Sequence, residues 1–208
     1  MMNWTDFLWA IPAYFLGSIP TAVWLGRAKY DLDVREHGSK NAGATNTFRV
    51  LGKKAGRVVL SIDILKGMLA VLLPFFVLPF SFSSPHLTHI QLVASFMAVL
   101  GHVFPIFAGF KGGKGVATSL GVIVGLQPLA AGICLIVFLV VFIFTHYVSL
   151  GSVSAAVAFC CCLWLFPINT YALPVFGSLL ALIVIFAHRK NIRRLLDGTE
   201  NKMNLFKK

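Results

Sequence analysis

Long apolar runs separated by short polar segments dominate this chain. Phe7 to Gly26 forms the first run, and Gly67 to Phe110 and Gly115 to His188 continue for 44 and 74 residues without a single Asp, Glu, Lys or Arg. About 20 mostly apolar residues suffice to cross a hydrocarbon core roughly 30 Å thick. Each run therefore predicts one or more transmembrane helices.

Turn-forming residues divide the two longer runs into shorter spans. The stretch SFSSPH, Ser81 to His86, splits one run into two spans, and the other is divided into four by Pro128, by YVSLGS around Ser149 and by FPIN around Pro167. With the first run this gives seven crossings. The segment from Gly115 to Leu126 is the weakest, because at 1.5 Å per residue it covers only about 18 Å. A re-entrant half-helix here, with five crossings in total, is the alternative.

Composition excludes an ordinary soluble globule. Of the 208 residues, 58% are hydrophobic and 12% charged, against roughly 45–50% and about 25% in an average soluble chain. So few polar residues could not cover a core in water. The four cysteines, Cys134 and Cys160 to Cys162, lie inside apolar runs at spacings that suit neither a disulfide framework nor tetrahedral metal ligation. We therefore predict an all-α polytopic membrane protein, with residues 1–208 forming a single domain.

The formal net charge of +11 would, in a soluble domain, raise the question of nucleic-acid binding. The distribution argues against a nucleic-acid partner, because all 18 cations lie in three blocks: Arg27–Lys66, Lys111 with Lys114, and Arg189–Lys208. Such clustering is typical of positive-inside topology. With all three blocks in the cytoplasm, the last apolar run must hold an even number of crossings. This puts the N-terminus outside and the C-terminus in the cytoplasm.

The polar clusters all fall at the predicted cytoplasmic edge, in loops 30–57, 109–115, 145–152 and 188–200, while the centres of the spans carry no charge. A solute pathway would place polar groups at mid-depth. The pattern instead favours a site that takes one water-soluble substrate from the cytoplasm and one apolar substrate from the leaflet. A permease for phosphorylated solutes is the alternative, because it would also use basic, glycine-rich loops.

The first polar loop reads DLDVREHGSKNAGATNTFRVLGKKAG and is dense in glycine and in short hydroxyl and amide side chains. Small residues let backbone N–H groups approach an anion, and a guanidinium such as that of Arg49 can add a bidentate contact to phosphate. A solvated positive-inside loop would explain the lysines but not this density of glycine and asparagine. The candidates for anion binding are Ser39, Asn41, Gly43, Thr45 and Asn46.

The second polar loop, GFKGGKGVATSLG, places glycines around Lys111 and Lys114 immediately before a predicted helix. Free N–H groups and the helix dipole would then point at a ligand, which makes Gly112, Gly113 and Gly115 candidates for a phosphate cradle. It is not a P-loop, because Gly115 stands where Ser or Thr would bind magnesium and no strand precedes it. A flexible glycine turn with two topogenic lysines is the alternative.

The last polar stretch, HRKNIRRLLDGTENK, follows directly on the final apolar run. His188 and Asn191 are three residues apart and so share one helical face at the membrane edge. The four cations Arg189, Lys190, Arg193 and Arg194 are interpreted as topogenic or as ligands of anionic headgroups.

Asp63 and Lys66, also three apart, are interpreted as an ion pair that lowers the cost of placing both groups near lipid. The alternative is that they shape the floor of the site. None of the histidines other than His188 is assigned a catalytic role; these include His102.

These loops resemble the acyl-phosphate-dependent glycerol-3-phosphate acyltransferases of bacteria, the PlsY family. The resemblance implies transfer of a fatty acyl group from acyl phosphate to the 1-hydroxyl of glycerol 3-phosphate, giving lysophosphatidic acid and phosphate, as the first step of phospholipid synthesis. It further implies seven helices and an active site facing the cytoplasm at the bacterial inner membrane. The stretches that carry it are GSIPTAVWLGR (17–27), GSKNAGATNTFRVLGKKAG (38–56), GHVFPIFAGFKGGKGVATSLG (101–121), YVSLGS (147–152) and HRKNIRRLLDGTE (188–200).

By motif position, the resemblance implies that the short residues of the first loop and the glycines around Lys114 hold the acyl-phosphate group, with Ser149 nearby. Arg49 and Lys114 would neutralise phosphate charge, and His188 and Asn191 would position the glycerol hydroxyls. The sequence departs from the family pattern at two positions. Lys40 stands where glycine is expected, and Lys190 stands where glutamate is expected.

The chemistry implied by the resemblance needs no metal and no cofactor. An acyl phosphate has a good leaving group, so the enzyme chiefly orients two anions and stabilises the developing oxyanion. No histidine has an aspartate five residues later, so the His-x4-Asp dyad of other glycerolipid acyltransferases is absent. The proton of the attacking hydroxyl passes either to a substrate phosphate, which we favour, or to His188. The expected partners are the two substrates, membrane lipid and, through functional coupling, an acyl-phosphate synthase.

Overall fold

A computed structural model describes residues 4–78, 85–165 and 171–203, and within these ranges every regular element is a helix. The prediction of an all-helical chain is therefore confirmed. The expected break around Pro167 lies outside the described residues, as does most of the one at Ser81 to His86. The chain divides into two compact units, unit 1 (Met1–Leu126) and unit 2 (Gln127–Lys208).

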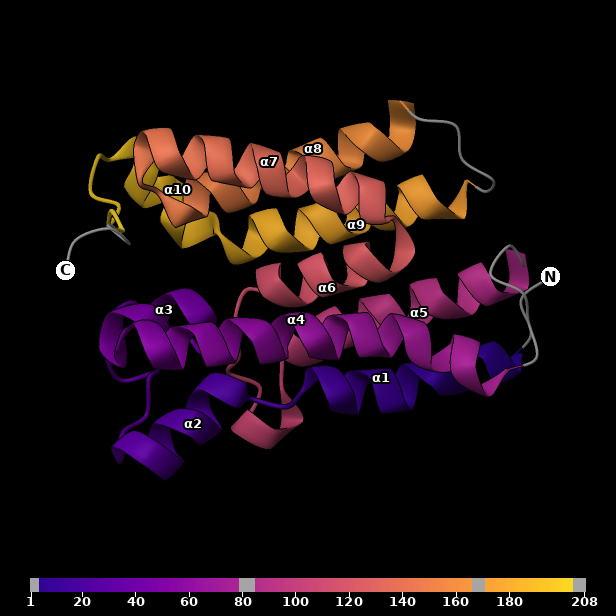
Figure 1. Cartoon of the computed structure of the whole chain (residues 1–208), viewed down its shortest axis with the longest axis horizontal. Coiled ribbons are helices and arrows are strands. Elements are labelled where there is room, and N and C mark those ends of the chain that lie inside the picture. Colours follow the sequence, from indigo (N-terminus) through magenta and orange to yellow (C-terminus); the bar gives the residue numbers. More distant parts are fainter. Residues whose placement is uncertain (1–3, 79–84, 166–170, 204–208) are drawn as a thin grey trace. The chain divides into compact units, whose positions relative to one another are not determined.

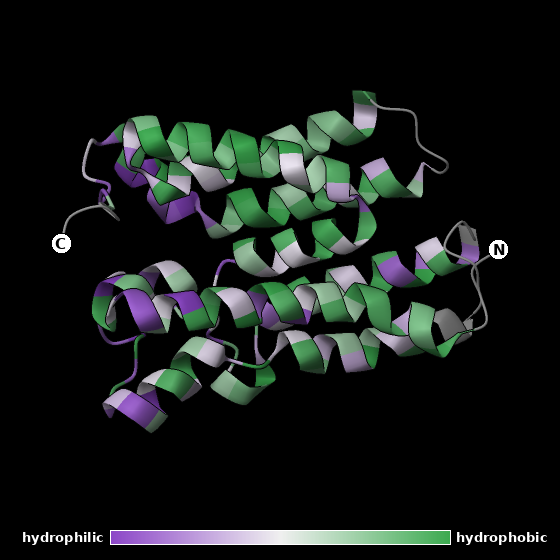
Figure 2. Ribbon diagram, in the orientation of Figure 1, coloured by the Kyte–Doolittle hydropathy of each residue, from purple (hydrophilic) through white to green (hydrophobic). Residues whose placement is uncertain are grey.

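Unit 1 is built around helices that run side by side in Figure 1. Helix α4 lies against α3, α5 and α6, and α1 lies against α5. Hydrophilic residues gather on α2, α3 and the first half of α4 (Figure 2). The elements are η1 (Trp4–Trp9), α1 (Ala10–Gly17), α2 (Thr21–Tyr30), α3 (Ala44–Val50), α4 (Gly52–Val77), α5 (Pro85–Val103), η2 (Ile106–Ala108) and α6 (Val116–Leu126).

The first apolar run is broken rather than continuous. Helix α1 ends at Gly17 and α2 begins after Pro20, since proline has no N–H to donate and its ring disfavours a helical residue before it. The break leaves the Ile19 carbonyl outside regular structure, where it accepts a hydrogen bond of 2.9 Å from Lys66 Nζ. A polar contact from α4 thus stabilises the interruption.

Helix α4 starts earlier than the sequence suggested. The helix begins at Gly52, inside the polar loop that the sequence extends to residue 57, so Asp63 and Lys66 lie well within it. Both side chains are buried and their charges neutralise each other at 2.8 Å. The predicted pairing of Asp63 with Lys66 is confirmed.

The short helix α6 packs closely on α4. Close approach of two helix backbones requires small residues at the contact. A Cβ atom on Gly67 would overlap the Thr118 carbonyl, and one on Gly121 would overlap the Ile64 carbonyl. The eleven residues of α6 are therefore held by backbone packing despite their short length.

Unit 2 contains three long apolar helices and a short polar one. Helix α8 (Val148–Leu165) lies against both α7 (Pro128–Thr145) and α9 (Ala172–Ala187). The chain then bends by 60° at His188 into α10 (Arg189–Leu196). In Figure 2 the hydrophilic residues of this unit gather on α10 and the segment after it.

Among the residues that the structure describes, five helical segments are long and apolar enough to cross a membrane, or six if the bent pair α9–α10 forms one span. Large apolar side chains such as Phe144, 83% exposed, and Leu129, 75% exposed, face outward, as expected for contact with lipid. Helix α6 falls below the length of a span, at the segment that the sequence marked as weakest. The five are Phe7–Tyr30, Gly52–Val77, His86–Ala108, Pro128–Thr145 and Val148–Leu165.

Candidate active site

The candidate residues fall into two groups, one in each unit. Unit 1 contains the first loop, the glycine-rich loop, Arg49 and Lys114, whereas unit 2 contains Ser149, His188 and Asn191.

The buried side chain of Asn46 forms hydrogen bonds to three residues of the first loop. Its side chain is 1% exposed. Its amide nitrogen donates to the carbonyls of Val34 (2.7 Å) and His37 (3.1 Å), and its amide oxygen accepts from the backbone N–H (2.8 Å) and hydroxyl (3.1 Å) of Ser39. With donors and acceptor both engaged, Asn46 shapes the loop that presents Ser39.

The other candidates in this loop lie at or near the surface. Ser39 is exposed, whereas Asn41 and Thr45 are half-buried; Gly43 has an extended conformation just before α3, and Arg49 is exposed on that helix. Lys40 has φ +55°, in the left-handed region where glycine is favoured. The departure from the family pattern therefore falls on a backbone position that suits glycine.

A carboxylate–guanidinium clamp joins the first loop to the segment before the glycines. Asp33 Oδ2 accepts from Nη2 of Arg35 at 2.7 Å and from Nη2 of Arg27 at 2.9 Å. Nη1 of Arg35 donates to the Ala108 carbonyl at 2.7 Å. The hydrogen bonds from Arg35 hold the pKa of Asp33 well below its usual value although burial opposes this. Sequence reasoning missed this clamp, because it treated Arg27 and Arg35 only as members of a topogenic block.

The glycine-rich loop folds back on the end of α5. The N–H of Gly112 donates to the Val103 carbonyl at 3.2 Å, and the N–H of Gly113 donates to the His102 carbonyl at 3.1 Å. The expectation that these two amides are free for a ligand is therefore wrong. The first N–H groups of α6, starting at Val116, have no acceptor within their own helix and so point toward the loop as donors.

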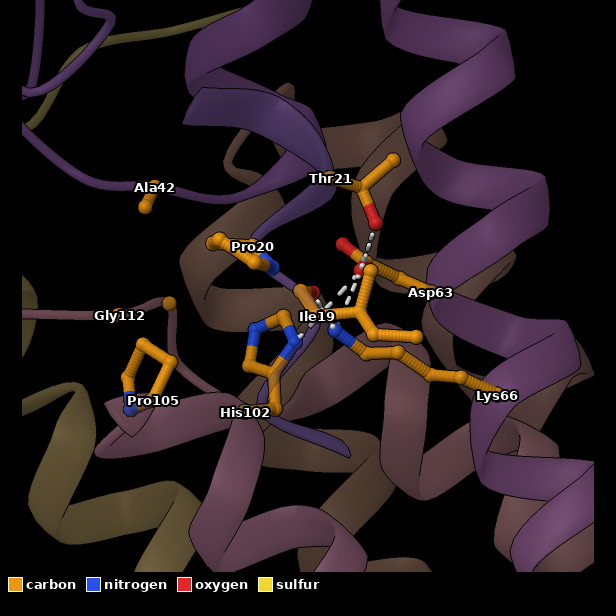
Figure 3. A pocket seen from close by; sticks show the side chains of 10 residues that line it. Ile19, Pro20, Thr21, Ala42, Asp63, Lys66, His102, Pro105 and Gly112 are labelled. Carbon is orange, nitrogen blue, oxygen red and sulfur yellow. Dashed lines mark hydrogen bonds and ion pairs between the residues drawn. The ribbon is translucent and has the colours of Figure 1, made fainter. Parts of the chain in front are cut away.

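Beneath this loop lies a buried polar cluster. Asp63 Oδ1 accepts from Lys66 Nζ at 2.8 Å and from Thr21 Oγ1 at 3.3 Å, and it lies 3.7 Å from His102 Nδ1. Figure 3 shows these side chains converging on a small pocket. Its lining also includes Ile19, Pro20, Ala42, Pro105, Gly112 and Gly113.

In unit 2, Glu200 brings two of the candidates together. Its Oε1 accepts from Asn191 Nδ2 at 2.6 Å and from Ser149 Oγ at 2.7 Å, while Oε2 accepts from Arg194 Nε at 2.7 Å. Burial alone would raise the pKa of Glu200, but these hydrogen bonds outweigh it and hold the pKa below its usual value. The carboxylate is ionised at neutral pH and fixes Ser149 against Asn191.

This arrangement changes the interpretation of two residues. Glu200 received no role from the sequence, and Arg194 was interpreted as topogenic, whereas its guanidinium binds Glu200. One signal was available: Gly198 follows the last turn of α10 with φ +70°, as in a helix-terminating turn. The chain reverses there, since the N–H groups of Thr199 and Glu200 both donate to the Arg194 carbonyl.

His188 lies at the bend between α9 and α10, and its side chain is buried. Its Nδ1 lies 2.8 Å from the Val184 carbonyl. Because a carbonyl can only accept, Nδ1 carries a proton in this hydrogen bond. The backbone of α9 thus fixes the orientation of the imidazole and the protonation of its Nδ1.

Within the described ranges no group of three or more His, Cys, Asp or Glu side chains could hold a metal ion. The expectation of a metal-free reaction stays a prediction. The polar groups gathered in the two units are amides, hydroxyls, guanidinium and ammonium groups and two imidazoles, those of His102 and His188, and donors of this kind suit oxyanions.

The fold and the two polar clusters define a polytopic helical membrane protein with basic, glycine-rich loops. The family model described as glycerol-3-phosphate acyltransferase matches residues 7–198, and the chain belongs to this family. A glycerol-3-phosphate acyltransferase of Listeria monocytogenes is 47% identical over 196 residues, covering 94% of this chain and 96% of the relative. One from Chlorobaculum parvum is 42% identical over 216 residues, covering 92% and 93%.

Solved structures agree with this assignment. The crystal structure of PlsY, described as an integral membrane glycerol 3-phosphate acyltransferase in its glycerol 3-phosphate form, is similar with a TM-score of 0.85 at 36% identity, covering 98% of this chain and 100% of that one. Its lysophosphatidic acid form gives a TM-score of 0.81 at 35% identity, covering 96% of each chain. The comparisons confirm the predicted family and the prediction of a membrane-bound glycerol-3-phosphate acyltransferase.

Proposed function

We propose that this chain transfers a fatty acyl group from acyl phosphate to the 1-hydroxyl of glycerol 3-phosphate, releasing lysophosphatidic acid and inorganic phosphate. The observation that carries the proposal is the match to the acyltransferase family over residues 7–198, which include nearly all of both polar clusters. In the reaction the hydroxyl oxygen bonds to the acyl carbon, the bond from that carbon to the phosphate oxygen breaks, and phosphate leaves.

Unit 1 supplies the groups that bind phosphate. Ser39, Asn41, Gly43 and Thr45 line the loop that Asn46 shapes, and they hold the acyl-phosphate headgroup together with the segment 112–115. Arg49 and Lys114 neutralise phosphate charge, which lowers the repulsion between two anionic substrates. Gly112 and Gly113 contribute by close packing on α5, whereas the N–H groups at the start of α6 serve as donors.

Unit 2 supplies the groups that position glycerol. Asn191 and Ser149 are fixed by the Glu200 carboxylate, and His188 is fixed by the Val184 carbonyl. With Nδ1 protonated, Nε2 can accept a hydrogen bond from a glycerol hydroxyl. The proton of the glycerol hydroxyl goes to a phosphate oxygen of a substrate, because this oxygen can itself act as the base.

The same proposal includes the membrane arrangement. Seven helices cross the bilayer when α6 and the bent α9–α10 pair are counted with the five long spans, and residues 1–208 act as one catalytic domain. The N-terminus lies outside, and the C-terminus and active site lie in the cytoplasm at the inner membrane, as the cation blocks favour. An acyl-phosphate synthase supplies the donor and is functionally coupled to this enzyme.

The test is release of phosphate by the purified protein in lipid, given palmitoyl phosphate and glycerol 3-phosphate with a metal chelator. We expect phosphate and lysophosphatidic acid in equal amounts. Lys114→Ala should lower kcat/KM by about a hundredfold or more, as loss of a donor to a developing oxyanion does. Lys111→Ala is the matched control, because Lys111 is an exposed neighbour in the same loop, and should stay near wild type.

Two results would contradict the proposal. Activity with acyl-CoA but not with palmitoyl phosphate would overturn the donor. Uptake of labelled glycerol 3-phosphate into vesicles without a lipid product would instead support the permease.

A further inference from the structure

The buried cluster of Asp63, Lys66 and His102 contains one polar side chain in addition to an ion pair. The three residues are 2%, 3% and 6% exposed and lie on helices that form candidate membrane spans. Two charges removed from water cost several kcal/mol unless they are paired and hydrogen-bonded. Lys66 and Asp63 meet that condition through each other, through the Ile19 carbonyl and through Thr21.

His102 adds a third polar group that this pairing does not require. Its Nδ1 is buried and makes no hydrogen bond within the described part of the chain; Asp63 Oδ1, at 3.7 Å, lies beyond hydrogen-bond distance. A buried polar atom left unsatisfied costs about 1–3 kcal/mol, so an apolar residue would fill this place more stably. The presence of the imidazole therefore needs a reason other than core packing.

The other side of the ring meets the glycine-rich loop. A Cβ atom added to Gly113 would overlap His102 Nε2, and one added to Gly112 would overlap the His102 carbonyl. The same carbonyl accepts the N–H of Gly113. Figure 3 shows the ring between the Asp63–Lys66 pair and Gly112. His102 is thus in contact with the loop through its side chain and its backbone at once.

Two loops with a predicted role border the pocket that this ring lines. Ala42 comes from the first loop, and Gly112 and Gly113 come from the second. Lys114 follows Gly113 directly in the chain. The position of Gly113 relative to α5 therefore determines the position of the Lys114 backbone. The ring is buried, and its Nδ1 lies 3.7 Å from Asp63 Oδ1, so it has little room to move away from the loop.

We propose that His102 is a positioning residue for acyl transfer: its buried imidazole and its carbonyl hold Gly112 and Gly113 in place and thereby position Lys114. The inference rests on the proposed function, since it concerns the same phosphate-binding loop. His102 itself touches neither substrate. It acts through the loop, which distinguishes its role from that of Lys114.

The first experiment compares His102→Ala with Gln91→Ala, a matched control on the same helix. Gln91 is also a buried polar residue of α5 and donates to the Val71 carbonyl on α4, but it does not line the pocket. Both variants should unfold at lower temperature. Only His102→Ala should raise the KM for palmitoyl phosphate, by about tenfold, as misplacement of a binding loop does. An unchanged KM in folded His102→Ala would overturn the inference.

A second pair of variants tests the contact between ring and loop. Gly113→Ala should lower kcat/KM because its methyl group collides with the imidazole, and adding His102→Ala should restore space for that methyl group. We expect the double variant to be about tenfold more active than the product of the two single effects, as coupled residues in contact give. Strict additivity would show that the two sites act independently and would contradict the proposal.

Hydrogen exchange separates this inference from the proposed function. The amides of Gly112 and Gly113 should exchange about tenfold or more faster in His102→Ala and at the wild-type rate in Gln91→Ala. An inactive wild-type protein would overturn the proposed function without affecting this readout. Unchanged exchange at these amides would overturn the inference even in a fully active enzyme.

Discussion

Glu200 shows how one buried carboxylate can organise a set of uncharged groups. The hydroxyl of Ser149, the amide of Asn191 and the guanidinium of Arg194 all donate to it, and its side chain is 4% exposed. Hydrogen bonds to an ionised group contribute about 1.5–3 kcal/mol each, more than those between neutral groups. The carboxylate therefore fixes the positions of Ser149 and Asn191.

We expect Glu200→Gln to lose both stability and activity. In the variant one carboxylate oxygen is replaced by an NH2 group, which would face a side-chain donor of Ser149, Asn191 or Arg194. The variant should therefore be about 2–3 kcal/mol less stable. Activity below the unfolding temperature should fall by about tenfold in kcat/KM for glycerol 3-phosphate, because Asn191 is no longer fixed. Thermal unfolding in lipid and steady-state kinetics measure the two effects.

Asp197→Asn is the control for that experiment. Asp197 is the other carboxylate of this segment, but its side chain is 58% exposed and its contact to Arg193 is 4.0 Å long. It should behave as wild type. A Glu200→Gln variant that matched this control would show that the hydrogen bonds to Glu200 do not position Asn191.

At Lys40 we expect a substitution to stabilise the protein rather than to destabilise it. A residue with a Cβ at φ +55° is strained by about 1 kcal/mol, and glycine relieves that strain. Lys40→Gly should therefore raise the unfolding temperature slightly and keep full activity, whereas Lys40→Ala removes the charge but keeps the strain. If both substitutions changed stability equally, charge rather than backbone conformation would be the cause.

The clamp between the two loops of unit 1 depends on the shape of a guanidinium. Arg35 reaches Asp33 and the Ala108 carbonyl at once, through different nitrogens. A lysine ammonium is a point charge on a flexible stem and cannot hold both. We expect Arg35→Lys to loosen residues 31–43 and 108–111 together, seen as faster hydrogen exchange in both segments, with about a tenfold loss of kcat/KM.

Arg27→Lys provides the comparison for the clamp. Arg27 makes a single contact to Asp33, and its side chain is 62% exposed. Exposed ion pairs contribute about 0–1 kcal/mol, so this variant should change neither exchange nor activity measurably. Loosening of only one of the two loops in Arg35→Lys would mean that they are not coupled through this residue.

Individual elements could be predicted where the signal is local. Apolar runs located the long helices, and the glycine–asparagine pattern located the loop around Ser39. The pairing of Asp63 with Lys66 was predicted from their spacing of three residues, whereas the start of α4 at Gly52 was not, because the residues from Lys53 to Arg57 are too polar to indicate a membrane span. The contact between Ser149 and Glu200 was missed because it joins residues 51 positions apart and depends on the chain reversal at Gly198.

At the scale of the whole molecule the open question is whether α6 crosses the membrane. Its eleven residues rise about 16 Å, roughly half of a hydrocarbon core, so it can span only if the bilayer thins or flanking loops enter the headgroup region. Backbone packing on α4 through Gly67 and Gly121 favours a crossing, because it aligns the short helix with a full-length span. We therefore expect Gln127, directly after α6, to face the outside.

Cysteine labelling in intact cells tests this expectation. In a background with the four native cysteines replaced, Gln127→Cys should react with a membrane-impermeant maleimide added from outside. Lys54→Cys, on the exposed surface at the start of α4, should react only after permeabilisation, because the proposed topology puts the cation-rich segments in the cytoplasm. Reaction of Gln127→Cys only after permeabilisation would make α6 a re-entrant half-helix. The count of seven crossings would then be wrong, although a cytoplasmic position of the glycine-rich loop would still stand.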